Sequence, residues 1–100
     1  MPINQAKQRQ MSESHGYVAV RTSTGSFTSE RAIALELADG REVSLFADKG
    51  LVDKRTSSEY LKVSVIKSDP VAKTKTLLLP SETFETMSRW VTVAQDKVVG

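Results

Sequence analysis

The amino-acid sequence predicts a small, mainly β domain with antiparallel strands. Apolar and polar residues alternate in several short segments, which is the period of a strand with one buried face. Turn residues such as Asp39-Gly40 and Ser68-Asp69-Pro70 separate these segments. No segment predicts a helix long enough to connect two parallel strands. Strands that follow one another along the chain are therefore expected to pair in antiparallel fashion.

The clearest hairpin spans residues 31–48, with its turn at Asp39-Gly40. A two-residue turn mixes apolar and polar residues on each face, whereas a three-residue turn over 38–40, with Gly40 left-handed in a G1 bulge, gathers the large aliphatic residues on one face. The latter predicts three opposite pairs: Leu37 with Arg41, Leu35 with Val43 and Ile33 with Leu45. Because a slip of one residue moves every side chain to the other face, we expect the three-residue turn. It places Glu36 opposite Glu42, which is mildly unfavourable.

Four more strands complete the expected set of six, at residues 17–21, 60–67, 73–79 and 89–94. The strand 60–67 alternates strictly and predicts inward side chains at Leu61, Val63 and Val65. In the strand 73–79, the parity that turns Leu77 inward also turns Lys75 inward, unless a bulge near Thr76 intervenes.

Three connections between these strands carry large apolar residues. In residues 48–59, Leu51 and Val52 are expected to form a helical turn that closes one end of the core. In the Ser- and Thr-rich residues 22–29, Phe27 is expected to fold back as a plug. After Pro80, Ser81 is the expected N-cap of one short helix over residues 81–88, with Phe84 and Met87 on one side.

The chain of 100 residues has the size of one domain, which we expect to span residues 17–95. Partial closure protects the edges of so small a sheet, so the expected fold is a six-stranded, partly closed antiparallel barrel, SH3-like or similar. A two-sheet β-sandwich is the alternative. Residues 1–16 are expected to form a flexible N-terminal tail, with Met11 as an alternative natural start to Met1, and residues 96–100 a frayed C-terminus.

Composition argues for an ordinary cytoplasmic domain. The chain has no cysteine, no apolar run that spans a membrane and no apolar stretch of the kind that a secretory signal needs. Its net charge of +2 is too small to indicate a nucleic-acid partner by itself. Residues 49–75, however, hold seven basic and three acidic side chains, so the basic surplus is concentrated there.

The sequence offers little for catalysis, and we expect no enzymatic activity. His15 is the only histidine and lies in the expected tail, away from any serine and aspartate arrangement. There is no glycine-rich phosphate loop and no spaced cluster of metal ligands, so neither a cofactor nor a metal is expected. Glu82 and Glu85 more simply favour the positive end of a short helix.

Two surfaces are candidates for binding. Phe46, Ile66 and Trp90 are assigned to faces opposite the aliphatic core, which indicates either a second small core beneath residues 81–88 or a patch that binds a protein. The alternative is a basic face with an aromatic residue, on which single-stranded nucleic acid stacks: Lys54, Arg55, Tyr60, Lys62, Lys73 and Lys75.

These observations favour a non-enzymatic binding or assembly module, although the sequence identifies no ligand. A protein partner or a second copy of the chain, giving a homo-oligomer, is the preferred expectation. Nucleic acid is the alternative, and no membrane partner is expected. An exposed Trp90 would support the first.

Overall fold

The computed structural model describes residues 14–25 and 27–99 of the chain. Within them lie eight strands and two 3-10 helices, with these bounds: β1 Ser14–Thr24, β2 Glu30–Glu36, β3 Glu42–Asp48, η1 Lys49–Leu51, β4 Val52–Arg55, β5 Ser58–Asp69, β6 Thr74–Leu78, β7 Trp90–Ala94, η2 Gln95–Lys97 and β8 Val98–Val99. The expected tail and the choice between Met1 and Met11 lie outside the described residues, except that 14–16 belong to β1.

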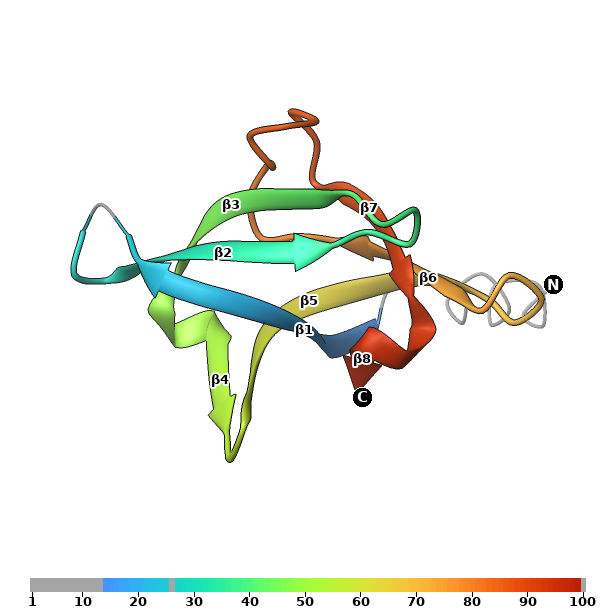
Figure 1. The fold of residues 1–100 in the computed structure, drawn as a ribbon, viewed down its shortest axis with the longest axis horizontal. Helices are drawn as coiled ribbons and strands as arrows, with labels where there is room; N and C mark the ends of the chain where they lie inside the picture. Colours follow the sequence, from blue (N-terminus) through green and yellow to red (C-terminus); the bar gives the residue numbers. More distant parts are fainter. Residues whose placement is uncertain (1–13, 26, 100) are drawn as a thin grey trace, which may run out of the picture.

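One antiparallel sheet contains all of these strands. Its main path follows the order β3-β2-β1-β5-β6-β7, while β4 pairs with β5 and β8 pairs with β1. The sheet curls into an open half-barrel (Figure 1). The backbone N–H of Ala38, in the β2–β3 turn, donates to the carbonyl of Thr92 in β7 at 2.9 Å, so this turn bonds to the last strand of the path. The predicted small antiparallel barrel is confirmed, and the chain does not form the alternative sandwich of two sheets.

The β2–β3 hairpin has the predicted register. Ile33 lies opposite Leu45 and Leu35 opposite Val43. Gly40 has a φ of 90°, and its N–H donates to the carbonyl of Leu37 at 2.9 Å. The three-residue turn with a left-handed glycine is therefore confirmed.

The like-charge pair that this register creates is relieved by neighbouring strands. Glu36 and Glu42 lie opposite each other. Glu42 forms an ion pair with Arg21 of β1, and Glu36 forms one with Lys97 of η2 at 3.5 Å. Each carboxylate therefore has its own cation.

The hydrophobic core lies on the concave side of the curled sheet. It is built of aliphatic side chains from six strands and the segments next to them: Val18, Ile33, Leu35, Leu37, Val43, Leu45, Ala47, Leu61, Val63, Leu77, Leu79, Val91 and Val93. Leu51 and Val52 pack against this core, as expected of a plug, although only Leu51 lies in a helical turn and Val52 begins β4. Phe27 is 69% exposed at the tip of the β1–β2 hairpin, so the prediction that it plugs the core is wrong.

The bulge in this part of the sheet lies in β5, and β6 itself is regular. The β5–β6 ladder shifts register between Val65 and Lys67, which makes Ile66 the extra residue. The β6–β7 ladder is continuous through Thr76, so β6 contains no bulge there. Lys75 therefore shares the parity of buried Leu77 and is half-buried.

Residues 81–88 form a loop instead of the expected short helix. The side chains of Thr83 and Thr86 bond to each other, and the Thr83 hydroxyl also accepts the N–H of Thr86. The N–H of Phe84 donates to Ser44 of β3 rather than along a helix. Threonine hydroxyls that bond locally compete with helical hydrogen bonding, which accounts for the difference.

The C-terminal residues also differ from the prediction. Residues 96–97 belong to η2, and β8 pairs with β1, with Val98 opposite Val18. Val98 packs against the core. The segment up to Val99 is therefore anchored rather than frayed.

Candidate functional site

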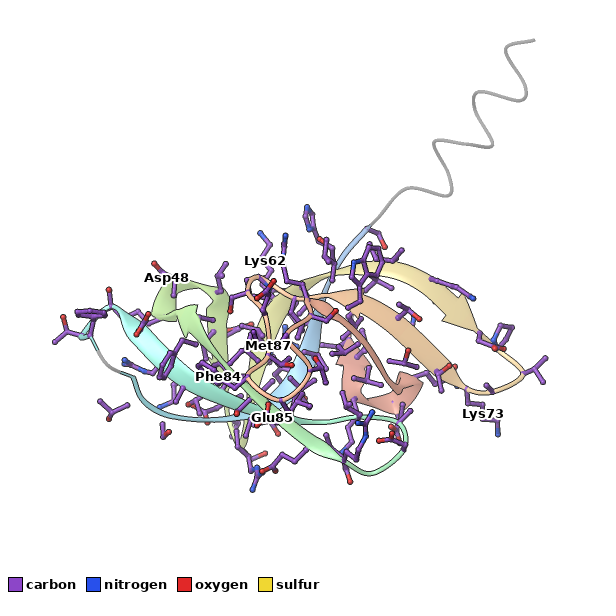
Figure 2. All side chains as sticks on the ribbon, turned by 90° about the horizontal axis from the view of Figure 1, so that it is seen from above. Asp48, Lys62, Lys73, Phe84, Glu85 and Met87 are labelled. Atoms are coloured by element: carbon purple, nitrogen blue, oxygen red, sulfur yellow. The ribbon has the colours of Figure 1, made fainter. Side chains whose placement is uncertain are left out.

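Exposed apolar side chains are concentrated in one loop. Among the residues that the structure describes, five large hydrophobic side chains are exposed, and three of them lie in the stretch 84–90: Phe84 is 57% exposed, Met87 72% and Trp90 55%. The other two, Phe27 and Val71, lie apart in hairpin turns. We call Phe84, Met87 and Trp90 the apolar crest. Figure 2 looks down on the loop and shows Phe84, Glu85 and Met87 together above the strands.

The crest loop is fastened to the outer edge of β3. The carboxylate of Glu85 accepts the backbone N–H of Ser44 at 2.7 Å and its hydroxyl at 2.6 Å. The N–H of Phe84 donates to the Ser44 carbonyl at 2.9 Å, and the Ser81 hydroxyl donates to the carbonyl of Phe46. The loop therefore satisfies backbone groups that an edge strand otherwise leaves open to pairing.

The contact with Ser44 changes the pKa of the Glu85 carboxyl group. Its pKa is lowered from the ordinary value of 4.5, because the Ser44 hydroxyl and N–H both donate to the charged form. The carboxylate is therefore the form that holds the loop on β3.

At the neck of the loop, Leu79 and Arg89 face each other. The N–H of Leu79 donates to the Arg89 carbonyl at 2.8 Å, and the Arg89 side chain donates Nε–H to the Leu79 carbonyl at 2.7 Å. Thr83 is 1% exposed and anchors the loop from within. The crest therefore projects from a well-fastened base.

The residues predicted for a protein partner fall in three places. Phe46 packs beneath the crest loop, with its ring at 5.2 Å from that of Phe84 in an edge-to-face arrangement. Trp90 lies opposite Leu78 on the neighbouring strand and is exposed. Ile66 is half-buried at the β5 bulge. The second small core thus contains Phe46, while Trp90 belongs to a surface.

A hollow borders the crest on the side of Trp90. It has a volume of about 430 Å³ and lies between the β2–β3 turn and β7. Trp90 and Thr86 line it from the crest side, and Ala38 and Arg41 line it from the turn. A projecting loop and a concavity thus adjoin each other on the same face.

The residues predicted for nucleic acid separate into two groups. Arg55, Tyr60 and Lys62 lie on β4 and β5, where the Arg55 guanidinium stands 4.9 Å from the ring centre of Tyr60 and 5.5 Å from that of Tyr17. Tyr17 is opposite Lys62, so it joins this group from β1. These four residues form an aromatic and basic cluster.

Acidic neighbours offset part of the positive charge in and beside this cluster. Within it, Arg55 pairs with Asp53 at 3.0 Å. The neighbouring Lys54, which was also predicted for nucleic acid, lies 3.9 Å from Glu59. Arg55 also covers the ring faces on which bases would stack. The cluster therefore presents less free positive charge and less free aromatic surface than its composition indicates.

Lys73 and Lys75 lie at the other end of β5. Lys73 is in the β5–β6 turn, and Lys75 is opposite Ser68. At 3.3 Å per residue, the strand separates Tyr60 from this turn by about 30 Å. Figure 2 shows Lys62 and Lys73 well apart. The structure therefore does not bring Lys73 and Lys75 together with Tyr60 and Lys62.

Sequence reasoning missed Tyr17, Phe84 and Met87 as surface residues. The sequence places Tyr17 on a strand and predicts no function for it. Its position next to the inward-facing Val18 nevertheless indicates that its side chain points outward. Phe84 and Met87 were assigned to one side of the expected helix. Their exposure depends on the contact of the loop with Ser44, which is distant in the chain.

The described residues contain no group of three His, Cys, Asp or Glu side chains that could hold a metal ion. His15 lies in β1, where it is exposed and opposite Ser64. Neither 3-10 helix of the described chain has the length and apolar character needed to cross a membrane.

Comparison with protein-family models, with curated proteins and with solved structures finds no match for this chain.

Proposed function

We propose that the protein is a non-enzymatic assembly module that associates with a second copy of itself through the apolar crest. The observation that carries this proposal is the concentration of Phe84, Met87 and Trp90 in the short stretch 84–90, which comprises a fastened loop and the first residue of β7. Clustered apolar side chains on a rim of polar residues are typical of protein interfaces. Tryptophan in particular is enriched among the residues that dominate binding energy.

Self-association is favoured over another protein because the surface complements itself. The crest projects beside a hollow of about 430 Å³ that Trp90 lines. In a two-fold dimer each copy contributes the same patch, so a projection on one copy can enter the hollow of the other. Asp39 and Arg41 line the hollow and pair with each other at 2.7 Å, so its rim carries balanced charge that a second copy of the same surface can approach.

Sedimentation velocity over a range of concentrations tests this proposal. We expect a dimer that persists in high salt, because burial of apolar surface is not screened. Met87→Ser and Trp90→Ser should each weaken the dimer about tenfold or more, since burial of such a side chain contributes about 1.5–3 kcal/mol.

The matched controls are Phe27→Ser and Val71→Ser, which remove exposed apolar side chains elsewhere. They should leave the dimer unchanged, and circular dichroism checks that all four variants fold. A protein that stays monomeric throughout, or a dimer that the crest variants leave intact, would contradict the proposal.

A second candidate function is the binding of single-stranded nucleic acid at the cluster of Tyr17, Arg55, Tyr60 and Lys62. It is supported by the grouping of two tyrosine rings with Arg55 and Lys62 on adjacent strands, and bases can stack there once Arg55 moves off the rings. Fluorescence anisotropy with a labelled oligonucleotide distinguishes the two candidates, because affinity for nucleic acid falls steeply with salt. Loss of binding in Lys62→Ala but not in Lys73→Ala would support this second function. The cytoplasmic location expected from the sequence stays a prediction.

A further inference from the structure

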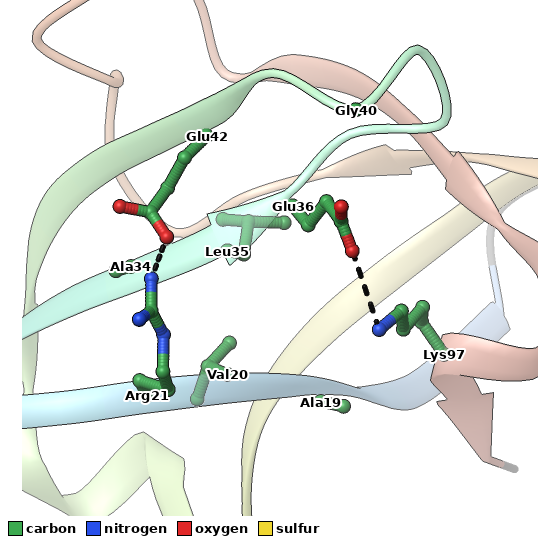
Figure 3. A pocket seen from close by; sticks show the side chains of 9 residues that line it. All are labelled: Ala19, Val20, Arg21, Ala34, Leu35, Glu36, Gly40, Glu42 and Lys97. Carbon is green, nitrogen blue, oxygen red and sulfur yellow. Dashed lines mark ion pairs between the residues drawn. The ribbon is translucent and has the colours of Figure 1, made fainter.

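A cleft opens where β1 and β2 stop pairing. Their ladder ends at the pair Arg21 and Ala34, because the earlier part of β1 pairs instead with β8. A cavity of about 380 Å³ lies in this split, between residues 19–21 of β1 and 34–36 of β2 (Figure 3).

Glu36 and Ala19 both face the cleft beyond the end of the β1–β2 ladder, and only Glu36 has no strand neighbour there, because the β1–β8 register continues from Val18 and Val98 to Ala19 and Lys97. Alternate residues of a strand direct their N–H and C=O groups to opposite edges. Leu37 directs its N–H toward β3, so Glu36 faces β1. Thr22 directs its N–H toward β5, so Ala19 faces β2. The β1–β2 ladder stops at Arg21 and Ala34, two residues before Ala19 and Glu36 would pair.

The two sides of the cleft carry side chains of opposite charge. Arg21 and Lys97 stand on the wall of β1 and η2, whereas Glu36 and Glu42 stand on the wall of β2 and β3 (Figure 3). Arg21 pairs with Glu42 and Lys97 with Glu36 across the opening. Each of these side chains is at least 41% exposed, so the pairs contribute little to stability and can exchange partners.

The base of the cleft is apolar. Leu35 is 2% exposed there, and Val20 packs against the same core. The small side chains of Ala19 and Ala34 leave room above them. A ligand in this cleft therefore meets apolar surface below, backbone groups at its sides and charges of opposite sign on the two walls.

We propose that this cleft binds a short peptide with free termini, at the size of a dipeptide. The ammonium group of the peptide pairs with Glu36 and Glu42, and its carboxylate pairs with Arg21 and Lys97. Its peptide group bonds to the open backbone at Glu36, and an apolar side chain packs on the base. A zwitterion is favoured because it supplies a new partner to both members of each ion pair that it opens, Arg21 with Glu42 and Lys97 with Glu36, whereas a single charge would leave the opposite members without one. This site is separate from the apolar crest and does not depend on its association.

Titration of the whole protein with alanyl-leucine, followed by NMR and calorimetry, tests the proposal. We expect saturable shifts centred on the amides of Ala19 and Glu36. N-acetyl-alanyl-leucine lacks the ammonium group and alanyl-leucinamide lacks the carboxylate, so each should bind about tenfold more weakly or worse. Glu36→Gln and Lys97→Gln should weaken binding of alanyl-leucine to a similar degree.

Lys67→Gln removes an exposed cation on β5 outside the cleft and serves as the matched control. It should leave binding unchanged. Ala19→Leu fills the cleft with an apolar side chain and should abolish binding while the rest of the NMR spectrum stays native. Equal affinity for the three peptides, shifts centred elsewhere, or the absence of shifts at millimolar alanyl-leucine would overturn the proposal.

Discussion

At the scale of the residue, Gly40 holds the turn on which the β2–β3 register depends. Its φ of 90° lies in the left-handed region, and a Cβ added there would meet nothing within 4 Å. A side chain at this position is therefore unfavourable because of the left-handed backbone conformation, and not because it would collide with neighbouring atoms. We expect Gly40→Ala to lower the free energy of unfolding by about 1–2 kcal/mol, measured by urea denaturation. Asparagine tolerates this conformation better, so Gly40→Asn should cost less. Equal losses would contradict this explanation.

The Glu85 carboxyl group makes stability depend on acid. Because its folded pKa lies below its ordinary value of 4.5, its contribution is fully present above that value and is lost as the pH falls through the folded pKa. Ser44→Ala removes the hydroxyl donor and should raise the pKa toward 4.5 in an NMR titration of the Glu85 carboxyl carbon. Ser81→Ala removes a different contact of the loop and should leave that pKa lowered. An unchanged pKa in Ser44→Ala would show that the hydroxyl is not the cause.

At the scale of the element, the pairing of β8 with β1 anchors the C-terminal segment. Val98 packs on the core, whereas Val99 is not among the residues that do so. We expect Val98→Ala to lower the free energy of unfolding by about 1 kcal/mol, the value for roughly one or two buried methylene groups, and Val99→Ala by less. Thermal unfolding measures both. The reverse order would mean that the segment is held by something other than Val98.

Some secondary-structure elements could be predicted from the sequence and others could not. The register of the β2–β3 hairpin was predictable, because only one turn length places Ile33 and Leu35 on the same face as Val43 and Leu45. The short strands β4 and β8 were missed, since four and two residues carry too little alternation to be recognised. The loop over 81–88 was mistaken for a helix, because its conformation is set by Ser44 from another strand.

At the scale of the whole molecule, the aliphatic core stabilises the curl of the sheet. Leu45 is fully buried in β3, and its truncation in Leu45→Ala should lower the free energy of unfolding by about 2–5 kcal/mol. Truncating the half-buried Ile66 at the bulge, in Ile66→Ala, should cost less because fewer atoms lose contacts. Urea denaturation measures both, and a larger loss at Ile66 would show that the bulge, rather than the core, governs stability.

The arrangement of candidate sites could be predicted only in part. Outward parity correctly placed Tyr60 and Lys62 on one strand. It could not show that Lys73 lies about 30 Å farther along, because the length of a paired strand depends on its partners. Nor could it separate Phe46 from Trp90, since burial of Phe46 requires Phe84 from the crest loop.

Trp90 is the only tryptophan of the chain, so its fluorescence reports on the apolar crest alone. The most direct measurement is the emission maximum of Trp90 and its quenching by acrylamide, over a range of protein concentrations in high salt. If the crest is the surface through which two copies associate, the emission shifts to shorter wavelength and quenching weakens as the dimer forms. A dimer that forms by sedimentation while Trp90 stays equally quenched would contradict the proposed interface.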